Sequence, residues 1–118
     1  MRAFYAVILD LVLVVVFAAT GRASHAETLD AAGVMSTAWP FLVAALAGAA
    51  IVALLRWPAV SLRSGALIWL ITLAGGMGLR VATGGTTAVA FIIVAGTTLA
   101  LLLFGWRAVA ALLARRSA

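Results

Sequence analysis

Four long runs of apolar residues, separated by short polar stretches, constrain this chain more than any other feature. The runs cover about residues 4–20, 38–55, 65–80 and 87–106, and a membrane-spanning helix needs about 20 apolar residues. Only 9% of the 118 residues are charged, whereas a soluble domain carries about 25%. A chain this short has too little interior to hide so much apolar surface from water. The sequence therefore predicts one all-α domain, an integral membrane four-helix bundle made of two helical hairpins.

The first run has a competing interpretation as a cleaved signal peptide. Arg2 supplies the positive start of such a peptide, and Ser24-His25-Ala26 offers small residues for a cleavage site. Against this, Asp10 lies inside the apolar stretch. We expect a retained membrane span.

Two polar segments are expected to lie outside the spans. The stretch 21–37 is predicted to be a loop, with Ser36 or Thr37 capping the second helix. Pro40 would then fall in the first turn of that helix, where its missing N–H costs little. Residues 107–118 keep a helical pattern of apolar residues and arginines, which predicts an amphipathic tail at the membrane surface.

The segment Ile68–Arg80, in the third run, carries three glycines, Gly75, Gly76 and Gly78. In water, a glycine in a helix interior costs about 1 kcal/mol relative to alanine. In a membrane, small residues instead allow two helices to approach closely. Together with Gly48 in the second run, these glycines are predicted to form helix-packing surfaces.

The eight arginines, in a chain without lysine, set the predicted orientation. Six of them fall at the N-terminus, the second connection and the tail: Arg2, Arg56, Arg63, Arg107, Arg115 and Arg116. Cytoplasmic loops carry an excess of basic residues, so both termini of this multi-pass protein are predicted to be cytoplasmic, near anionic lipid headgroups. The arginine- and alanine-rich usage favours a bacterial inner membrane. Nucleic-acid binding is not expected, because the basic residues lie between apolar runs.

A faint repeat with an offset of 50 residues links the second and fourth runs. Thr37-Ala38 and Phe41 recur as Thr87-Ala88 and Phe91. Duplicated hairpins of this kind would be related by a pseudo-two-fold axis along the membrane normal. Alanine-rich spans also match by chance, so both interpretations stay open.

Asp10 is the sharpest polar signal inside the apolar runs. A carboxylate near mid-membrane costs about 2.5–3.5 kcal/mol on insertion scales, so Asp10 should face the bundle interior and find a partner or take a proton. In a structural role it would pair with Arg56 or Arg107, or cap a neighbouring helix. In a functional role it would form a proton or cation site, with Thr72 and Thr97 as further polar groups. Those threonine hydroxyls can also bond to carbonyls of their own helices.

A second candidate site lies at the predicted outer side. Arg22, His25 and Arg80 are predicted to form a cationic cluster there, with Glu27 and Asp30 as counter-charges. Such a cluster would suit anions or lipid headgroups, and its histidine would titrate near neutral pH. The alternative is a solvated loop whose charges only set topology.

The sequence predicts no enzyme and no cofactor. There is no cysteine, which excludes thiol catalysis. Ser24, His25 and Glu27 are triad residue types but stand too close together in sequence. The single histidine and two nearby acids lack a metal-ligand spacing, and Gly76-x-Gly78 lacks the third glycine of a dinucleotide fingerprint.

Several local strings carry a family resemblance. They are Asp10, Gly21-Arg22 with Ser24-His25, Thr37-Ala38-Trp39-Pro40-Phe41, Trp69, Gly75 to Arg80, Thr87 to Phe91, and Gly105-Trp106-Arg107. Over almost its whole length the chain resembles a family of small membrane proteins of actinobacteria and haloarchaea known as domain of unknown function 3054. The resemblance implies four spans and adds weight to the candidate residues in helix one and the cationic cluster. It supplies no substrate, cofactor or partner.

Two function classes follow from these observations. The first is a small transporter or channel for an ion or solute, acting as a homo-oligomer because four short helices enclose little room. The second is a non-catalytic accessory or scaffold subunit that packs against another membrane protein. Native mass measurement after gentle extraction separates self-association from a heterologous partner.

Overall fold

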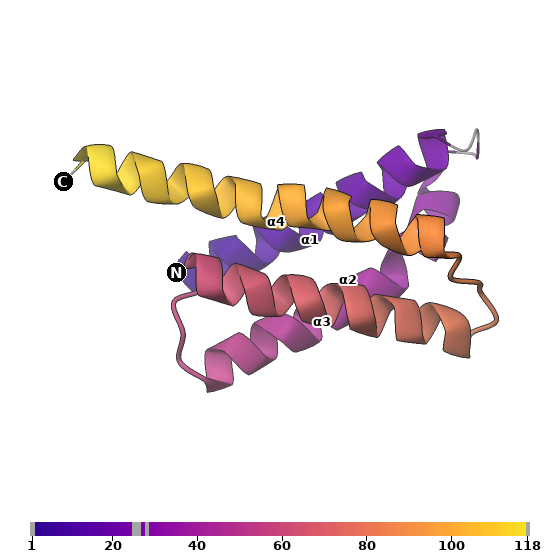
Figure 1. Ribbon diagram of the computed structural model, residues 1–118, viewed down its shortest axis with the longest axis horizontal. Coiled ribbons are helices and arrows are strands. Elements are labelled where there is room, and N and C mark those ends of the chain that lie inside the picture. Colours follow the sequence, from indigo (N-terminus) through magenta and orange to yellow (C-terminus); the bar gives the residue numbers. More distant parts are fainter. Residues whose placement is uncertain (1, 25–26, 28, 118) are drawn as a thin grey trace.

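The computed structural model describes residues 2–24, 27 and 29–117, and that part of the chain is built from helices and connections. Its four helices are α1 (Arg2–Ser24), α2 (Ala31–Leu54), α3 (Leu62–Ala82) and α4 (Val89–Ser117), shown in Figure 1. Each is long and apolar enough to cross a membrane. The predicted all-α membrane bundle is therefore confirmed.

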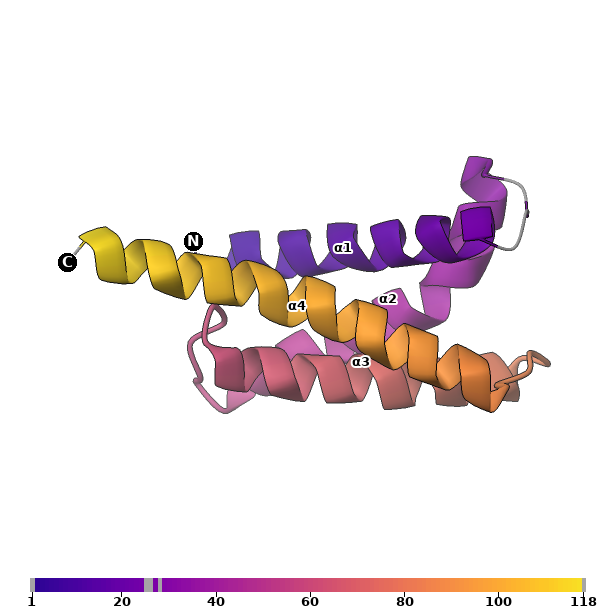
Figure 2. The ribbon, with the colours of Figure 1, turned by 45° about the horizontal axis from the view of Figure 1, so that its top comes forward.

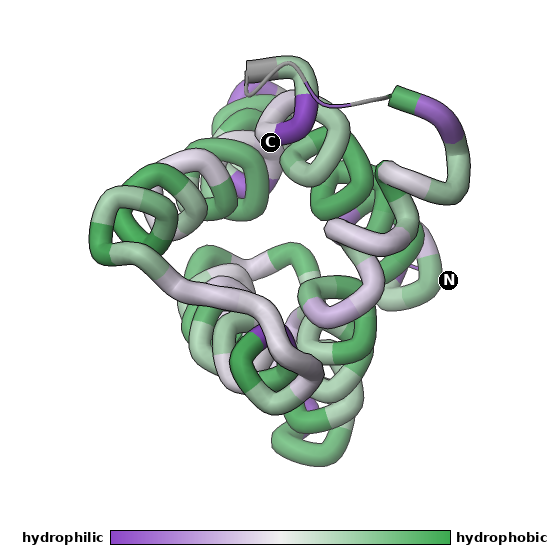
Figure 3. Tube along the Cα trace, turned by 90° about the vertical axis from the view of Figure 1, so that its right-hand side faces the viewer, coloured by the Kyte–Doolittle hydropathy of each residue, from purple (hydrophilic) through white to green (hydrophobic). Residues whose placement is uncertain are grey.

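The helices form an up-and-down ring. Each helix packs against its neighbour in sequence, and α1 closes the ring by contacting α4. We call the end with the N-terminus, the α2–α3 connection and the C-terminus the terminal end, and the opposite end the distal end. Figure 3 views the bundle from the distal end. In Figure 1, α1 and α4 cross near the middle of the bundle, and in Figure 2 they lie close together toward the terminal end; in both views they separate toward the distal end.

Helix α2 begins seven residues earlier than the sequence predicted. Its N-cap is Asp30, whose Oδ1 accepts a hydrogen bond from the backbone N–H of Gly33 at 2.8 Å. Ser36 and Thr37 therefore lie inside the helix, and so does Pro40, rather than in the first turn. In Figure 2 the first turns of α2 run at an angle to the rest. A proline in a helix interior removes a backbone hydrogen bond and bends the helix, which accounts for this change of direction.

Helix α4 also departs from the prediction. It continues without interruption to Ser117, so residues 107–118 are not a separate surface tail. The residues after Arg107 are mostly alanine and leucine, which favour helix strongly. Arg107 itself is fully buried, so it is not among the arginines available to lipid headgroups.

The close approach of α2 and α3 depends on two glycines that the sequence singled out. A Cβ atom added to Gly48 would lie 3.3 Å from the Cα of Ile68. One added to Gly75 would lie 3.0 Å from the Cβ of Ala44. Small residues on both helices thus let the two backbones pack directly on each other.

Gly76 and Gly78 have different surroundings. A Cβ at Gly76 would overlap the ring of Phe41, a fully buried core residue that packs edge-on against Phe17 with ring centroids 5.3 Å apart. Gly78 is exposed, and a Cβ added there would meet no atom of the described residues within 4 Å. Its expected packing role is therefore not fulfilled inside one copy of the chain, because this side of α3 faces away from the bundle.

Candidate functional site

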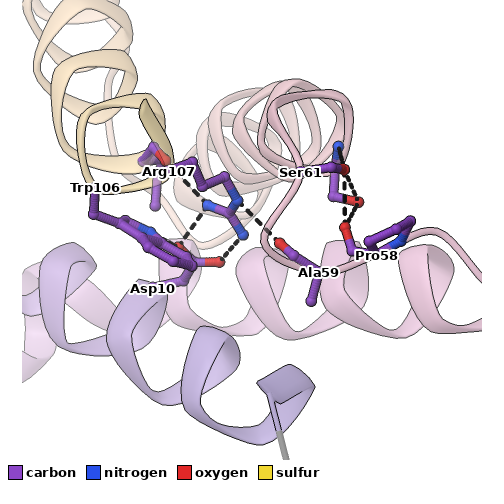
Figure 4. A network of polar contacts seen from close by, with 8 residues as sticks. Asp10, Pro58, Ala59, Ser61, Trp106 and Arg107 are labelled. Carbon is purple, nitrogen blue, oxygen red and sulfur yellow. Dashed lines mark hydrogen bonds and ion pairs between the residues drawn. The ribbon is translucent and has the colours of Figure 1, made fainter. Parts of the chain in front are cut away.

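Asp10 of α1 forms a two-pronged ion pair with Arg107 of α4 (Figure 4). Arg107 Nη2 donates to Asp10 Oδ2 at 2.7 Å, and Nη1 donates to Oδ1 at 2.9 Å. Bidentate guanidinium–carboxylate pairs of this length are among the strongest hydrogen bonds in proteins. Arg107 is 0% exposed and Asp10 3% exposed. Of the two partners that the sequence offered for Asp10, the structure selects Arg107.

Other groups complete this polar cluster. The indole Nε1 of Trp106 donates to Asp10 Oδ1 at 2.8 Å. Arg107 also donates through Nε to the carbonyl of Ala59 at 3.1 Å and through Nη1 to the carbonyl of Leu103 at 3.0 Å. Burying a charged pair costs free energy unless its remaining donors and acceptors are satisfied. These bonds use four of the five N–H groups of Arg107 and join α1, α4 and the α2–α3 connection.

The start of α3 holds the other side of Arg107. Ser61 caps α3 by accepting a hydrogen bond from the Ser64 backbone N–H. Both serine hydroxyls donate to the Pro58 carbonyl, at 2.8 and 2.6 Å, which fixes the connection that presents Ala59. A Cβ at Gly65 would lie only 2.7 Å from Arg107 Cδ. The arginine therefore reaches Asp10 because α3 carries a glycine at this point.

A small cavity of about 80 Å³ lies beside the ion pair. Asp10 and Arg107 line it together with Ala6, Trp57 and Ala59. That volume is enough for one or two water molecules. The terminal end of the bundle is thus nearly closed around the pair.

A much larger cavity, of about 520 Å³, lies at the distal end. We call it the distal cavity. It is formed by residues from all four helices and from the α1–α2 and α3–α4 connections: Phe17, Ala18, Thr20, Gly21, Arg22, Glu27, Thr37, Arg80, Ala88, Ala90, Phe91, Val94 and Thr98. Most of these come from α1 and α4, the two helices that separate toward this end (Figures 1 and 2).

Arg80, in the last turn of α3, is held at this cavity by the α3–α4 connection and by α4. Its Nε donates to the Thr86 carbonyl at 2.7 Å, and its guanidinium carbon lies 4.5 Å from the centre of the Phe91 ring. A Cβ at Gly85 would come within 2.7 Å of Arg80 Cγ, so the Gly84-Gly85 turn makes room for the side chain. No acidic side chain of the described residues forms an ion pair with Arg80.

Arg22 lines the same cavity from α1. Its Nη1 donates to Thr37 Oγ1 at 3.1 Å and lies 3.2 Å from Glu27 Oε2. The structure therefore brings Arg22 and Arg80 to one cavity, as the sequence predicted for the cationic cluster. His25, the third predicted member, lies outside the described residues.

A packed apolar layer lies between the distal cavity and the ion pair. Val14 of α1 and Leu99 and Leu103 of α4 are all 0% exposed, and none of them lines either cavity. Along α1, Val14 lies between cavity-lining Phe17 and ion-paired Asp10. The two polar regions are thus separate sites within one copy of the chain.

Thr72 and Thr97 do not join Asp10. The Thr72 hydroxyl is fully buried and has no hydrogen-bond partner among the described residues. Thr97 is exposed on the outer surface of α4, in a shallow groove that it shares with Trp69. The indole of Trp69 instead donates to the Gly96 carbonyl at 2.9 Å, joining α3 to α4. The predicted intramembrane site of Asp10, Thr72 and Thr97 is therefore not assembled, because the three side chains point to different surroundings.

Sequence reasoning missed Trp106 and Gly65 as parts of the Asp10 cluster. The only sequence signal for Trp106 was its position next to Arg107, a candidate partner of Asp10. Gly65 lay at the expected start of the third helix, where nothing indicated contact with an arginine. No cluster of three or more metal-ligating side chains occurs in the part of the chain that the structure describes.

A comparison with family models decides the family. The model described as a protein of unknown function (DUF3054) matches residues 7–110. The chain belongs to the DUF3054 family. The match includes Asp10, Arg107 and every described residue that lines the distal cavity, so both sites lie within the DUF3054 region. No curated protein and no solved structure matches the chain.

Proposed function

We propose that this DUF3054 protein is a small membrane transporter without enzymatic activity, which works as a homo-oligomer in a bacterial cytoplasmic membrane. The distal cavity is its substrate site, and the Asp10–Arg107 cluster is its closed gate. One observation carries the proposal: a cavity of about 520 Å³ enters the bundle from one end and stops above a packed layer and a buried ion pair. This arrangement suits a transporter that is open on one side of the membrane and closed on the other.

The cavity has the size and charge of a site for an anionic substrate. Small-molecule sites usually measure about 300–1,000 Å³ and combine apolar walls with a few polar groups. Here the polar groups include two arginines, of which Arg22 is partly neutralised by Glu27. Arg80 supplies the remaining positive charge.

The ion pair has the properties of a gate because it ties α1 to α4 at the terminal end. Opening a path there requires α1 to move away from α4, which breaks the bonds of Asp10 to Trp106 and Arg107. A buried ion pair is a costly choice for stability alone, since apolar residues of similar volume often stabilise equally well. It is better suited to an element with two discrete arrangements.

The distribution of charge supports cytoplasmic termini. With Arg107 buried, five arginines stay near the terminal end, Arg2, Arg56, Arg63, Arg115 and Arg116, against two at the distal end. The positive-inside rule then places the distal cavity outside and the terminal arginines near anionic headgroups. A C-terminal reporter that is active only outside the cytoplasm should stay inactive, and strong activity would reverse the orientation.

Cysteine accessibility tests the gate, and the chain has no native cysteine to interfere. Thr98→Cys places a thiol in the distal cavity, Ala6→Cys beside the ion pair, and Val12→Cys on the exposed, lipid-facing side of α1. A membrane-impermeant maleimide should modify Thr98→Cys from outside and leave the other two unmodified. Adding Asp10→Asn should expose Ala6→Cys from the cytoplasm and slow the reaction of Thr98→Cys.

If Asp10→Asn leaves the rates of maleimide modification at Ala6→Cys and Thr98→Cys unchanged, the gate is contradicted and the ion pair is a structural lock. Trp106→Phe provides a milder variant, because it removes one hydrogen bond to Asp10 and keeps the ion pair. It should change the reactivity of Ala6→Cys and Thr98→Cys in the same directions as Asp10→Asn does, but by a smaller amount.

The alternative function is a non-catalytic accessory or scaffold subunit. A shallow apolar groove of about 590 Å³ on the outer surface of α3 and α4 favours it, since Gly96, Ala100 and Gly105 there would let another helix approach closely. Native mass measurement after gentle extraction discriminates: a homo-oligomer supports the transporter, and a stoichiometric foreign membrane protein supports the scaffold.

A further inference from the structure

The distal cavity has the depth of one lipid leaflet. Its lining on α4 runs from just before the helix at Ala88 to Thr98, ten residues that span about 15 Å at the helical rise of 1.5 Å per residue. The hydrocarbon core of a bilayer is about 30 Å thick, so each leaflet contributes about half of that. A hydrocarbon chain that entered at the distal end would therefore fit beside the cavity wall without crossing to the other leaflet.

The cavity is also open toward the membrane. Val94 lines it and is 60% exposed, and Ala90 and Thr20 are exposed cavity residues on the two facing helices. A residue that lines a cavity and is also exposed on a membrane-spanning surface marks an opening to lipid. The deeper walls, Phe17 and Ala18, are apolar and buried. A water-soluble ion gains nothing from such walls, whereas an acyl chain does.

The guanidinium of Arg80 lies at the distal end of the cavity, where the headgroup of such a lipid would lie. Arg80 stacks on Phe91, near the start of α4, and the one hydrogen bond of its side chain to a described residue uses Nε. Its Nη1 and Nη2 atoms have no hydrogen-bond or ion-pair partner among the described residues. A guanidinium with two free nitrogens matches the paired oxygens of a phosphate.

We propose that the distal cavity binds one anionic glycerophospholipid from the distal leaflet, with its phosphate on Arg80 and one acyl chain between α1 and α4. The inference rests on the proposed transport function in making this lipid class the substrate, but binding is measurable without transport. Arg22 is a second, weaker contact because Glu27 already neutralises it.

Lipid binding to the delipidated full chain, measured by native mass spectrometry, tests the proposal. Phosphatidylglycerol is titrated against phosphatidylcholine with the same acyl chains, and glycerol 3-phosphate serves as a soluble headgroup probe. We expect one tight phosphatidylglycerol per chain, weaker binding of phosphatidylcholine and no competition from glycerol 3-phosphate. Competition by glycerol 3-phosphate at similar concentration would overturn the lipid assignment in favour of a water-soluble anion.

Charge variants locate the headgroup. Arg80→Gln should weaken phosphatidylglycerol binding about tenfold or more, as expected for losing hydrogen bonds from a charged donor. Arg116→Gln, an exposed position at the terminal end, is the matched control and should leave the one tight site unchanged, because any headgroup that it meets lies at the opposite end of the bundle. Glu27→Gln should strengthen binding roughly two- to fivefold by releasing Arg22 from an ion pair whose carboxylate is half-exposed. Equal effects of Arg80→Gln and Arg116→Gln would contradict a specific site.

A steric variant locates the chain without changing charge. Val94→Trp should fill the opening between α1 and α4 and abolish tight binding, whereas Val109→Trp, at a similarly exposed position outside the cavity, should not. Both substitutions are on the exposed surface, so folding should survive. Full binding by Val94→Trp would overturn the proposal. If lipid binds as expected and the accessibility of Ala6→Cys never changes, the lipid site stands and the transport function fails.

Discussion

Three arginine side chains lie against the bundle interior or the distal cavity, and each lies against a glycine. A Cβ atom would come 2.6 Å from Arg22 Nη2 at Gly33, 2.7 Å from Arg107 Cδ at Gly65 and 2.7 Å from Arg80 Cγ at Gly85. A long charged side chain needs space along its stem before its guanidinium can reach a partner. The glycines supply that space, so at the residue scale each polar site depends on a residue that has no side chain.

The Asp10–Arg107 pair should show strong energetic coupling. Removing one member of a buried ion pair leaves an uncompensated charge and costs about 3–5 kcal/mol, so Asp10→Leu and Arg107→Met should each lower the free energy of unfolding by about that amount. The double variant should lose clearly less than the sum, because both charges are gone. Reversible unfolding in mixed micelles measures the cycle, and additivity within about 0.5 kcal/mol would contradict coupling.

Gly65→Ala tests the space beside Arg107. The added methyl group would clash with Arg107 Cδ. The Arg107 side chain cannot move aside easily, because hydrogen bonds fix its guanidinium and α4 fixes its backbone. We expect a lower melting temperature in detergent and greater accessibility near Asp10. Gly105→Ala is the matched control, because nothing lies within 4 Å of its Cβ position. Equal melting temperatures for the two variants would mean that Arg107 relaxes without cost.

At the scale of elements, α2 and α3 end in the same way with different residues. At the end of α2, Trp57 N–H bonds to the Val52 carbonyl and Arg56 N–H to that of Ala53, with Arg56 at a positive φ of 60°. This is a Schellman motif. At the end of α3, Gly84 takes the equivalent position with φ 92°. Glycine adopts this conformation without strain, whereas arginine does not.

Arg56→Gly should therefore stabilise the protein. The left-handed conformation costs a residue with a side chain roughly 1–2 kcal/mol, which glycine avoids, offset in part by its greater freedom in the unfolded chain. We expect a net gain of up to about 1 kcal/mol in unfolding free energy. Arg56→Ala removes the same charge and keeps the strain, so it should show no gain. A stabilised Arg56→Ala would show that charge, and not backbone strain, is responsible.

Sequence alone placed the helices but misplaced their ends. The apolar runs predicted which segments cross the membrane, because a helix in contact with lipid must carry apolar side chains. The start of α2 was missed because Asp30 caps a polar turn that precedes the apolar run. For Asp10, Arg56 and Arg107 looked equally suitable in sequence. The structure shows why only Arg107 pairs with Asp10. Arg56 is exposed in the Schellman motif that ends α2. Gly65 leaves space for the Arg107 side chain, and the Ala59 carbonyl accepts a hydrogen bond from it inside the bundle.

At the scale of the whole molecule, the bundle is nearly closed at one end and holds a large cavity at the other. The ion pair closes α1 against α4 at the terminal end, and the same two helices separate around the distal cavity (Figures 1 and 2). Residues Arg22 and Arg80 were predicted to cluster from topology, but the cavity between them was not. Its existence depends on how far two helices diverge, which a linear hydrophobic pattern does not encode.

Movement of an anionic lipid across the bilayer is the activity that the proposed function requires, and it is measurable in liposomes. Purified protein is reconstituted into liposomes that contain a fluorescent, tail-labelled phosphatidylglycerol, and a membrane-impermeant reductant bleaches the outer-leaflet probe. Protein-containing liposomes should lose the inner-leaflet fluorescence as well. Arg80→Gln should slow this loss about tenfold or more, and Arg116→Gln should not. Bleaching of only the outer-leaflet fraction, as in protein-free liposomes, would contradict the proposed function.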